Sequence, residues 1–153
     1  MVSKRIEEEI LQDKFSSAYQ KSVINILVTA NVIYARMNRF LKAFDLSQEQ
    51  YNVLRILRGQ KGKPVGVLLI QERMMDKMSN ASRLVDKLEH KELVVRKQSK
   101  EDRRQVEITI TENGMKKLAD IDASMNFFDD NDFNPDDFEA FNQMLDEIRE
   151  RFK

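Results

Sequence analysis

The stretch Ser79–Arg104, which reads SNASRLVDKLEHKELVVRKQSKEDRR, decides the fold. On a helical wheel of about 100° per residue, its first half places apolar side chains on one side of a short helix. Its second half places two strands, residues 93–98 and 104–110, around the polar turn 99–102. The helix has an inner side of Ala81, Leu84, Val85 and Leu88, and an outer side of Ser79, Ser82, Arg83, Asp86, Lys87 and His90 with Asn80 at its flank.

This order predicts a winged helix-turn-helix. An α-helix fits into the DNA major groove, and a cationic hairpin beside it reaches the sugar–phosphate backbone or the minor groove. Each half alone has an ordinary explanation, either a solvated helix face or a salt-rich surface turn. The two halves in succession favour DNA contact over these explanations.

The outer side of the helix carries the first candidate contacts. Arg83 can donate two parallel hydrogen bonds to guanine, whereas Lys87, one turn later, is a point charge better suited to phosphate. The helix N-terminus favours an anion, so we expect phosphate contacts there. Asn80 could alternatively read adenine. The residues expected at this end are Ser79, Asn80 and Ser82.

The hairpin turn carries the second set of candidate contacts. Arg103 is expected to enter the minor groove, because narrow A·T minor grooves attract guanidinium groups. Asp102 is expected to orient an arginine through a bidentate pair rather than to touch DNA. The residues expected to serve phosphates are Arg104, Lys100 and Lys97.

The rest of the chain is predicted to be mainly helical. Residues from about Ile6 to Phe44 are predicted to be helical, with a sustained apolar stripe from Val23 to Phe44. Ser47 with Gln50 forms a capping box for a helix over 48–58. Pro64 suits the start of a helix over 65–75, and Asp76 is expected to cap the helix with Ser79 at its third position. Thr111 is expected to cap one further helix, and Pro135 is expected to start the last one.

The terminal helices are predicted to form a homodimer. A helix of about 13 residues reads only a few base pairs, so useful specificity needs two copies about 34–36 Å apart on one face of DNA. The alternative is that the apolar stripes cover the chain's own core. The division expected is a dimerisation part at 1–46, a DNA-binding part at 47–110 and a dimerisation part at 111–153. The interface residues expected are Ile6, Ile10, Leu11, Phe15, Phe138, Phe141, Leu145, Ile148 and Phe152.

Composition and charge narrow the function. The 153 residues contain no Cys and one His, which excludes disulfides and thiolate–metal sites. The net charge is zero, but residues 60–104 carry 12 Lys and Arg against 7 Asp and Glu, and residues 119–153 carry 3 against 11. The basic segment is the one that the pattern assigns to DNA. The charged N-terminus and the short apolar run at 23–34 favour a cytoplasmic protein without a membrane partner.

The motif Ser82–Gly114, SRLVDKLEHKELVVRKQSKEDRRQVEITITENG, resembles the multiple antibiotic resistance regulator (MarR) family. The resemblance lies in the recognition helix, the Leu-Val that opens the first strand, the Asp-Arg-Arg wing and the Ile-Thr-x-x-Gly entry to the next helix. It implies a homodimeric repressor or activator that binds a pseudo-palindrome and is often released by a small, commonly aromatic, ligand. One departure is Glu92, where the family often has a glycine as helix C-cap. By analogy, the effector pocket would be lined by Tyr34, Met37, Phe40 and Tyr51.

The sequence gives less support to other functions. The sequence shows no nucleophile–base pair, metal-ligand spacing, cofactor motif or phosphate loop, so we expect neither an enzyme nor a bound metal or cofactor. The acidic run at 129–137 lacks the calcium-loop pattern. A winged helix used for protein contact should have an apolar outer face, and this one is polar and basic. DNA binding without any ligand is an alternative that the sequence leaves open.

Overall fold

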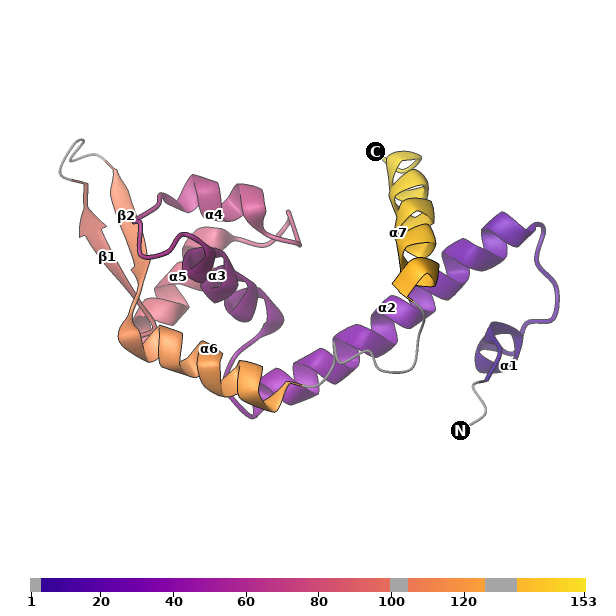
Figure 1. The fold of residues 1–153 in the computed structure, drawn as a ribbon, viewed down its shortest axis with the longest axis horizontal. Helices are drawn as coiled ribbons and strands as arrows, with labels where there is room; N and C mark the ends of the chain where they lie inside the picture. The colour runs from indigo at the N-terminus through magenta and orange to yellow at the C-terminus, as the bar shows by residue number, and fades with distance from the viewer. Residues whose placement is uncertain (1–3, 100–104, 126–134) are drawn as a thin grey trace. The chain divides into compact units, whose positions relative to one another are not determined.

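The computed structural model describes residues 4–99, 105–125 and 135–153. Within these ranges the fold is mainly α-helical with one antiparallel hairpin, as predicted (Figure 1). The chain divides into two compact units, Met1–Ile121 and Asp122–Lys153. The elements are α1 (Ile6–Ile10), α2 (Ala18–Lys42), α3 (Gln48–Gly59), α4 (Val67–Arg73), α5 (Ala81–His90), β1 (Val94–Gln98), β2 (Val106–Ile110), α6 (Glu112–Ser124) and α7 (Pro135–Glu150).

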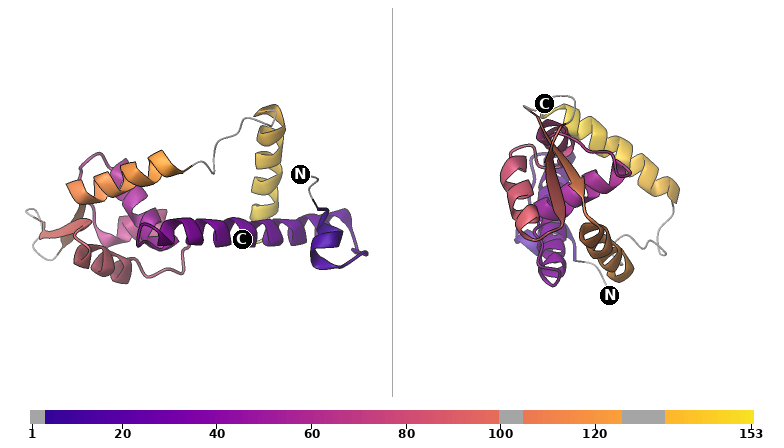
Figure 2. Two further views of the ribbon diagram at one scale, coloured as in Figure 1. Left: turned by 90° about the horizontal axis from the view of Figure 1, so that it is seen from below. Right: turned by 90° about the vertical axis from the view of Figure 1, so that its left-hand side faces the viewer.

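The core lies where α3, α4 and α5 meet the hairpin (Figures 1 and 2). Each of these elements contributes side chains that are almost completely removed from water, which is the main source of stability in such a domain. The end of α2 and the inner face of α6 also contribute buried residues. Among the described residues, the largest fully buried side chains are Leu41, Val53, Leu54, Leu57, Ile70, Met74, Val85, Leu88, Ile108, Leu118 and Ile121.

The hairpin pairs β1 with β2 in an antiparallel register, from Val94 opposite Ile110 to Gln98 opposite Val106. A third segment joins it before α4. The Val65 N–H donates to the Ile108 carbonyl at 3.1 Å, and the Ile108 N–H donates to the Val65 carbonyl at 2.8 Å. The helix predicted over 65–75 is therefore shorter than expected, because Val65 is used in a β-bridge and α4 begins only after the N-cap Gly66.

The prediction of one continuous helix from Ile6 to Phe44 is wrong. Leu11 has a left-handed backbone with φ 54° and ends α1, and α2 starts after the N-cap Ser17. The Ser17 hydroxyl accepts from the Gln20 N–H at 3.0 Å, and the Gln20 side chain accepts from the Ser16 N–H at 2.7 Å. Local caps of this kind offer the backbone an alternative to continuing the helix.

The C-terminus of α5 explains the departure at Glu92. The Leu93 N–H donates to the Leu88 carbonyl at 2.9 Å, and the Glu92 N–H donates to the Glu89 carbonyl at 2.8 Å. This pair of bonds is a Schellman motif, which needs a left-handed residue at the position of Glu92. Glu92 adopts φ 57° there. The turn that a glycine would make is therefore formed by a residue with a side chain.

The entry to α6 is built from the Ile-Thr-x-x-Gly motif. The Thr111 hydroxyl accepts from the Gly114 N–H at 3.0 Å, as predicted for a cap, and donates to the Glu92 carbonyl at 2.7 Å. A Cβ at Gly114 would overlap the Leu93 backbone carbonyl. The glycine thus allows α6 to approach the start of the hairpin closely.

Two kinds of feature are absent from the described residues. None of the helices there is both long enough and apolar enough to cross a bilayer. Within the same ranges, no group of three or more acidic or histidine side chains is placed to hold a metal ion.

Candidate nucleic-acid interface

The predicted two-sided character of α5 is present in the structure. Ala81, Val85 and Leu88 are at most 1% exposed. On the other side, Ser82, Arg83, Lys87 and His90 are exposed, so their polar groups are available to a surface outside the chain. The predicted inner residue Leu84 is only partly buried.

The start of α5 differs from the expectation. The helix begins at Ala81 with Asn80 as N-cap, because the Asn80 Oδ1 accepts from the Arg83 N–H at 3.0 Å. The Ala81 N–H donates to the Gln71 side chain at 3.0 Å. Two N–H groups at this end are thus satisfied within the chain. The structure gives Asn80 a capping role, and its predicted DNA contact remains a prediction.

Asp76 caps the turn before α5 instead of the helix itself. Its carboxylate accepts from the Met78 N–H at 2.9 Å and from the Ser79 hydroxyl at 2.7 Å. The Ser79 hydrogen bond, followed by that from the Met78 backbone, lowers the pKa of Asp76 below its ordinary value. The sequence placed this residue at the wrong boundary because an Asp–x–x–Ser turn and a helix N-cap have the same spacing.

Arg96 joins the hairpin to α5. Its guanidinium lies 2.5 Å from the Asp86 carboxylate and 3.6 Å from that of Glu89, and it donates to the Ser82 carbonyl at 3.2 Å. The two acidic residues on α5 are therefore paired with β1. The exposed cations Arg83 and Lys87 are left as the charges that an anionic partner would meet on this helix.

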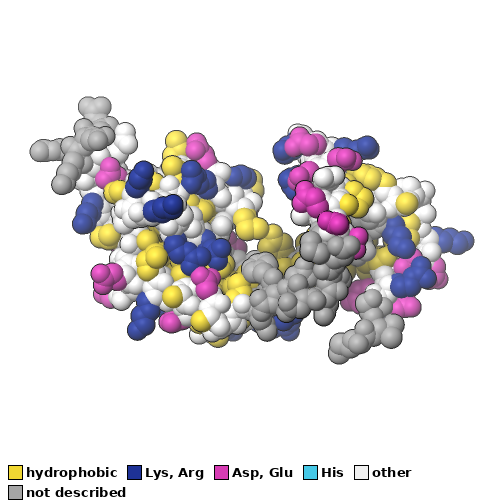
Figure 3. Space-filling view, in the orientation of Figure 1, with side chains coloured by type: hydrophobic (Ala, Val, Ile, Leu, Met, Phe, Trp, Pro, Cys, Tyr) yellow, Lys and Arg dark blue, Asp and Glu magenta, His cyan; other side chains and the backbone are white. Residues whose placement is uncertain are grey.

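The predicted wing contacts are only partly within the described residues. Lys97 is exposed on β1 and faces Glu107 across the strands. Lys100, Asp102, Arg103 and Arg104 lie outside the described residues. On the face drawn in Figure 3, Lys and Arg side chains gather over the helices next to the hairpin.

The predicted effector residues divide between surface and core. Tyr34 is 51% exposed, Met37 and Phe40 are half-buried, and Tyr51 is 9% exposed. The Tyr51 hydroxyl accepts from the Arg55 guanidinium at 3.0 Å. A cavity of about 350 Å³ between the end of α3 and the start of α6 includes none of these four residues.

The predicted dimerisation residues are largely uncovered. On α7, Phe138 and Phe141 are 37% and 46% exposed, and Phe152 beyond its end is 69% exposed. Leu145 and Ile148 are half-buried. Near the N-terminus, Ile6 is buried, Ile10 and Phe15 are half-buried, and Leu11 is 90% exposed.

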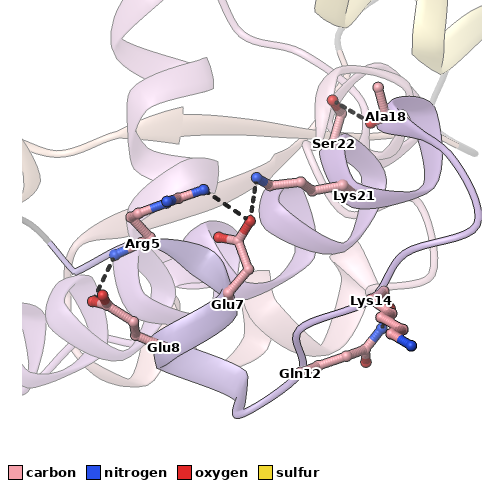
Figure 4. Close-up of polar contacts among 8 residues, drawn as sticks. All are labelled: Arg5, Glu7, Glu8, Gln12, Lys14, Ala18, Lys21 and Ser22. Atoms are coloured by element: carbon pink, nitrogen blue, oxygen red, sulfur yellow. Dashed lines mark hydrogen bonds and ion pairs between the residues drawn. The ribbon is translucent and has the colours of Figure 1, made fainter.

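A polar cluster holds α1 against α2 (Figure 4). The Glu7 carboxylate lies 2.5 Å from the Lys21 ammonium and 3.3 Å from the Arg5 guanidinium. The Lys21 hydrogen bond is the largest cause that lowers the pKa of Glu7. A cavity of about 540 Å³ beside this cluster extends along α2 as far as Val32, which is 59% exposed.

Sequence reasoning missed two features of this interface. Arg96 had no local signal, because its carboxylate partners lie on another element. The exposure of Met75 and Met78, at 81% and 91%, was not predicted. Both residues lie in the turn between α4 and α5, where the sequence had predicted helix.

Comparisons with known proteins agree with this geometry. Residues 46–106 match the model of the MarR family. No curated protein matches the sequence. A MarR transcription factor from Planctomyces limnophilus is 27% identical with a TM-score of 0.63, over 91% of this chain and 96% of that one.

Two further solved structures are more distant and show the fold alone. The organohalide-sensing regulator RdhR in its 2,4-dichlorophenol-bound form has a TM-score of 0.73 at 16% identity, over 93% of this chain and 88% of that one. A mutant of S. aureus MepR bound to an oligodeoxyribonucleotide has a TM-score of 0.57 at 17% identity, over 92% of this chain and 100% of that one.

These matches are to transcription regulators rather than to enzymes. The match covers α3, α4, α5 and β1, the elements that form the core and carry the outer face of α5. The likeness to the MarR family that the motif in Ser82–Gly114 predicted is thus found by the family model over residues 46–106.

Proposed function

We propose that this protein is a sequence-specific regulator of transcription that binds double-stranded DNA through the outer face of α5. The observation that carries the proposal is the division of this helix. One face is locked into the core, and the other presents Ser82, Arg83 and Lys87 to solvent beside the hairpin. A recognition helix needs a buried face and an exposed polar face, because packing against the core fixes the position of the side chains that contact base edges.

Arg96 makes this face more cationic than the sequence of α5 alone implies. By pairing with Asp86 and Glu89, it offsets the negative charges nearest to Arg83 and Lys87. In the proposed complex, Arg83 reads guanine in the major groove and Lys87 contacts phosphate. Arg103, Arg104 and Lys100 of the wing, with Lys97, are proposed to bind phosphates and the minor groove, and Asp102 is proposed to orient an arginine.

The proposed binding unit is a homodimer on a pseudo-palindromic site. The α5 helix has 10 residues, so one copy reads few base pairs. The exposed aromatic residues of α7 support a second copy, because exposed aromatic rows of this kind are usually covered in the functional assembly. We retain residues 1–46 and 111–153 as the proposed dimerisation parts and 47–110 as the DNA-binding part.

We also propose that the protein acts as a repressor released by a small aromatic ligand. Support for the ligand comes from RdhR, a solved structure with this fold that is bound to a dichlorophenol. The proposed lining is the half-exposed Tyr34 ring, the half-buried Met37 and Phe40, and the buried Tyr51. Release of bound DNA on addition of chlorophenols or aromatic carboxylates would support control by a ligand. If none of these compounds changed DNA binding, the protein would be a ligand-independent regulator.

The direct test is a matched pair of arginine variants in a gel-shift titration. Arg83→Ala should weaken binding to the preferred site by about 1–3 kcal/mol and relax the base preference at one position. Arg149→Ala is the control, because Arg149 lies on α7 and pairs with Asp146 at 2.8 Å. Equal losses from both variants would contradict the assignment of α5 as the reading helix.

A second titration tests the wing. Arg103→Ala should weaken binding strongly, and Asp102→Ala should weaken it through the arginine that it orients. If both variants bound DNA as tightly as the parent protein, the wing would have no part in the complex. Retention on a partner protein but not on DNA at low salt would favour the alternative, a winged helix used for protein contact.

A further inference from the structure

The connection between α4 and α5, residues 74–80, contains three methionines in unequal surroundings. Met74 is 1% exposed and belongs to the core, whereas Met75 and Met78 are 81% and 91% exposed. Methionine is usually a residue that fills gaps in a core. Two exposed thioethers on the surface of a small domain therefore need an explanation.

The connection that carries them is anchored at several backbone groups. The Asn52 side chain of α3 accepts from the Met75 N–H at 2.9 Å, and the Asp76 carboxylate accepts from the Met78 N–H at 2.9 Å. The Gln71 side chain of α4 donates to the Lys77 carbonyl at 3.0 Å. The exposure of the two side chains is thus a property of a hydrogen-bonded turn rather than of an untethered loop.

The turn leads directly into the proposed reading helix. It ends at Asn80, which caps α5, and Arg83 follows within the first turn. Arg73 and Lys77 are exposed on the same segment, as are Glu72 and Asp76, so the segment itself carries no net charge. The exposed Arg83 that follows supplies a positive charge for phosphates or bases, and thymine methyl groups are the apolar surface of the major groove that exposed thioethers beside it would meet.

Fewer polar side chains are available to contact bases at the start of α5 than the sequence indicates. The Asn80 oxygen caps the helix and the Ser79 hydroxyl donates to Asp76. The two methionine side chains, in contrast, extend into solvent at this end of the helix. Their unbranched, polarisable chains adapt well to the shallow apolar surface of a methyl group.

We propose that Met75 and Met78 bind thymine C5-methyl groups in the major groove and give the recognised half-site a requirement for thymine. This inference rests on the proposed function, since it assigns a chemical preference to the same interface. It names the thymine methyl as the ligand and the two thioethers as specificity-determining groups.

A first experiment uses peroxide as a probe of the sulfurs. The protein is treated with hydrogen peroxide, free and bound to a duplex selected from a random pool, and methionine sulfoxide is mapped by mass spectrometry. Met75 and Met78 should oxidise quickly in the free protein and several-fold more slowly on DNA. Met74 should stay slow in both states and serves as the buried control. Unprotected Met75 and Met78 in a complex that binds normally would overturn the proposal.

A second experiment removes the methyl groups. Each replacement of a contacted thymine by deoxyuridine should weaken binding of the parent protein by about fourfold, because one buried methyl group is removed. The Met75→Leu/Met78→Leu variant should keep this discrimination, and the nearly isosteric Met75→Gln/Met78→Gln variant should lose it. An equal effect of deoxyuridine on parent and Gln variant would overturn the proposal. Absence of any gel shift by the parent protein would instead defeat the proposed function itself.

Discussion

Helices α5 and α7 both have an apolar face, but the two faces have different surroundings. The apolar face of α5 is closed within the chain, with Val85 and Leu88 at 0% exposure. The apolar face of α7 leaves Phe138, Phe141 and Met144 at 37%, 46% and 55%. Periodicity thus predicts which face of a helix requires cover, but it does not predict whether the same chain supplies that cover. The apolar face of α5 therefore belongs to the domain core, whereas we propose that the apolar face of α7 is covered by a second copy of the chain.

The largest expected effect is in the core. Leu88→Ala should lower the free energy of unfolding by about 2–5 kcal/mol, because it removes buried methyl groups and leaves a cavity between α5 and its neighbours. Chemical denaturation followed by circular dichroism measures the change. A value near zero would mean that α5 is not locked into the core and would remove the contrast with α7.

The matched change on α7 should act on assembly. Phe141→Ala is expected to weaken the dimer by about 1.5–3 kcal/mol, since two half-exposed rings lose their cover at a two-fold interface. Analytical ultracentrifugation over a concentration series gives the dissociation constant. The protein should still fold. A parent protein that is monomeric at micromolar concentration would contradict the assignment of α7 to an interface.

A third change tests close packing at the hairpin. Gly114→Ala should destabilise the domain by about 1–3 kcal/mol, because the added Cβ meets the Leu93 carbonyl, a backbone group that cannot move aside cheaply. Gly59→Ala is the control, because a Cβ there meets nothing within 4 Å. Thermal unfolding of the two variants should separate them clearly, and equal midpoints would argue against the close approach of α6 to the hairpin.

A fourth change should stabilise the folded protein. Glu92→Gly is expected to raise the free energy of unfolding by about 0.5–1 kcal/mol, because glycine adopts the left-handed conformation at φ 57° without steric cost. Denaturant titration against the parent protein measures the gain. Destabilisation by the variant would show that the Glu92 side chain makes a contact that outweighs its backbone strain.

The smallest effect concerns pH and the contact of α1 with α2. The pKa of Glu7 lies below its ordinary value of 4.5, so its stabilising contribution is present above about pH 4.5 and is lost as the pH falls through the lowered value. Carboxyl titration by NMR should show this shift, and Lys21→Met should abolish most of it. An unchanged Glu7 titration in that variant would contradict the ion pair.

Local signals predicted much of this fold. The capping box of Ser47 with Gln50 and the cap at Thr111 are present, and the two strands lie within the predicted ranges. These features depend on residues within a few positions of each other, so a sequence displays them. The order of elements followed from them.

Other features depend on partners far along the chain. Val65 left the predicted helix because it pairs with Ile108, and Arg96 finds its carboxylates on α5. Neither pairing has a local pattern. The prediction of helix from Ile6 to Phe44 missed the left-handed Leu11, which ends α1, and the Ser17 cap, which starts α2. In the candidate interface, the sequence predicted correctly that Arg83 and Lys87 lie on the exposed face of α5. It did not predict that the Asn80 and Ser79 side chains form hydrogen bonds within the chain.

Two copies of the α5 face are proposed to read one DNA site, and selection of bound duplexes from a random pool tests this most directly. We expect enrichment of a pseudo-palindrome with half-sites about one helical turn apart, guanine among the fixed bases, and affinity that falls steeply with salt. Failure to retain any duplex at low salt, or enrichment of sites without two-fold symmetry, would contradict it.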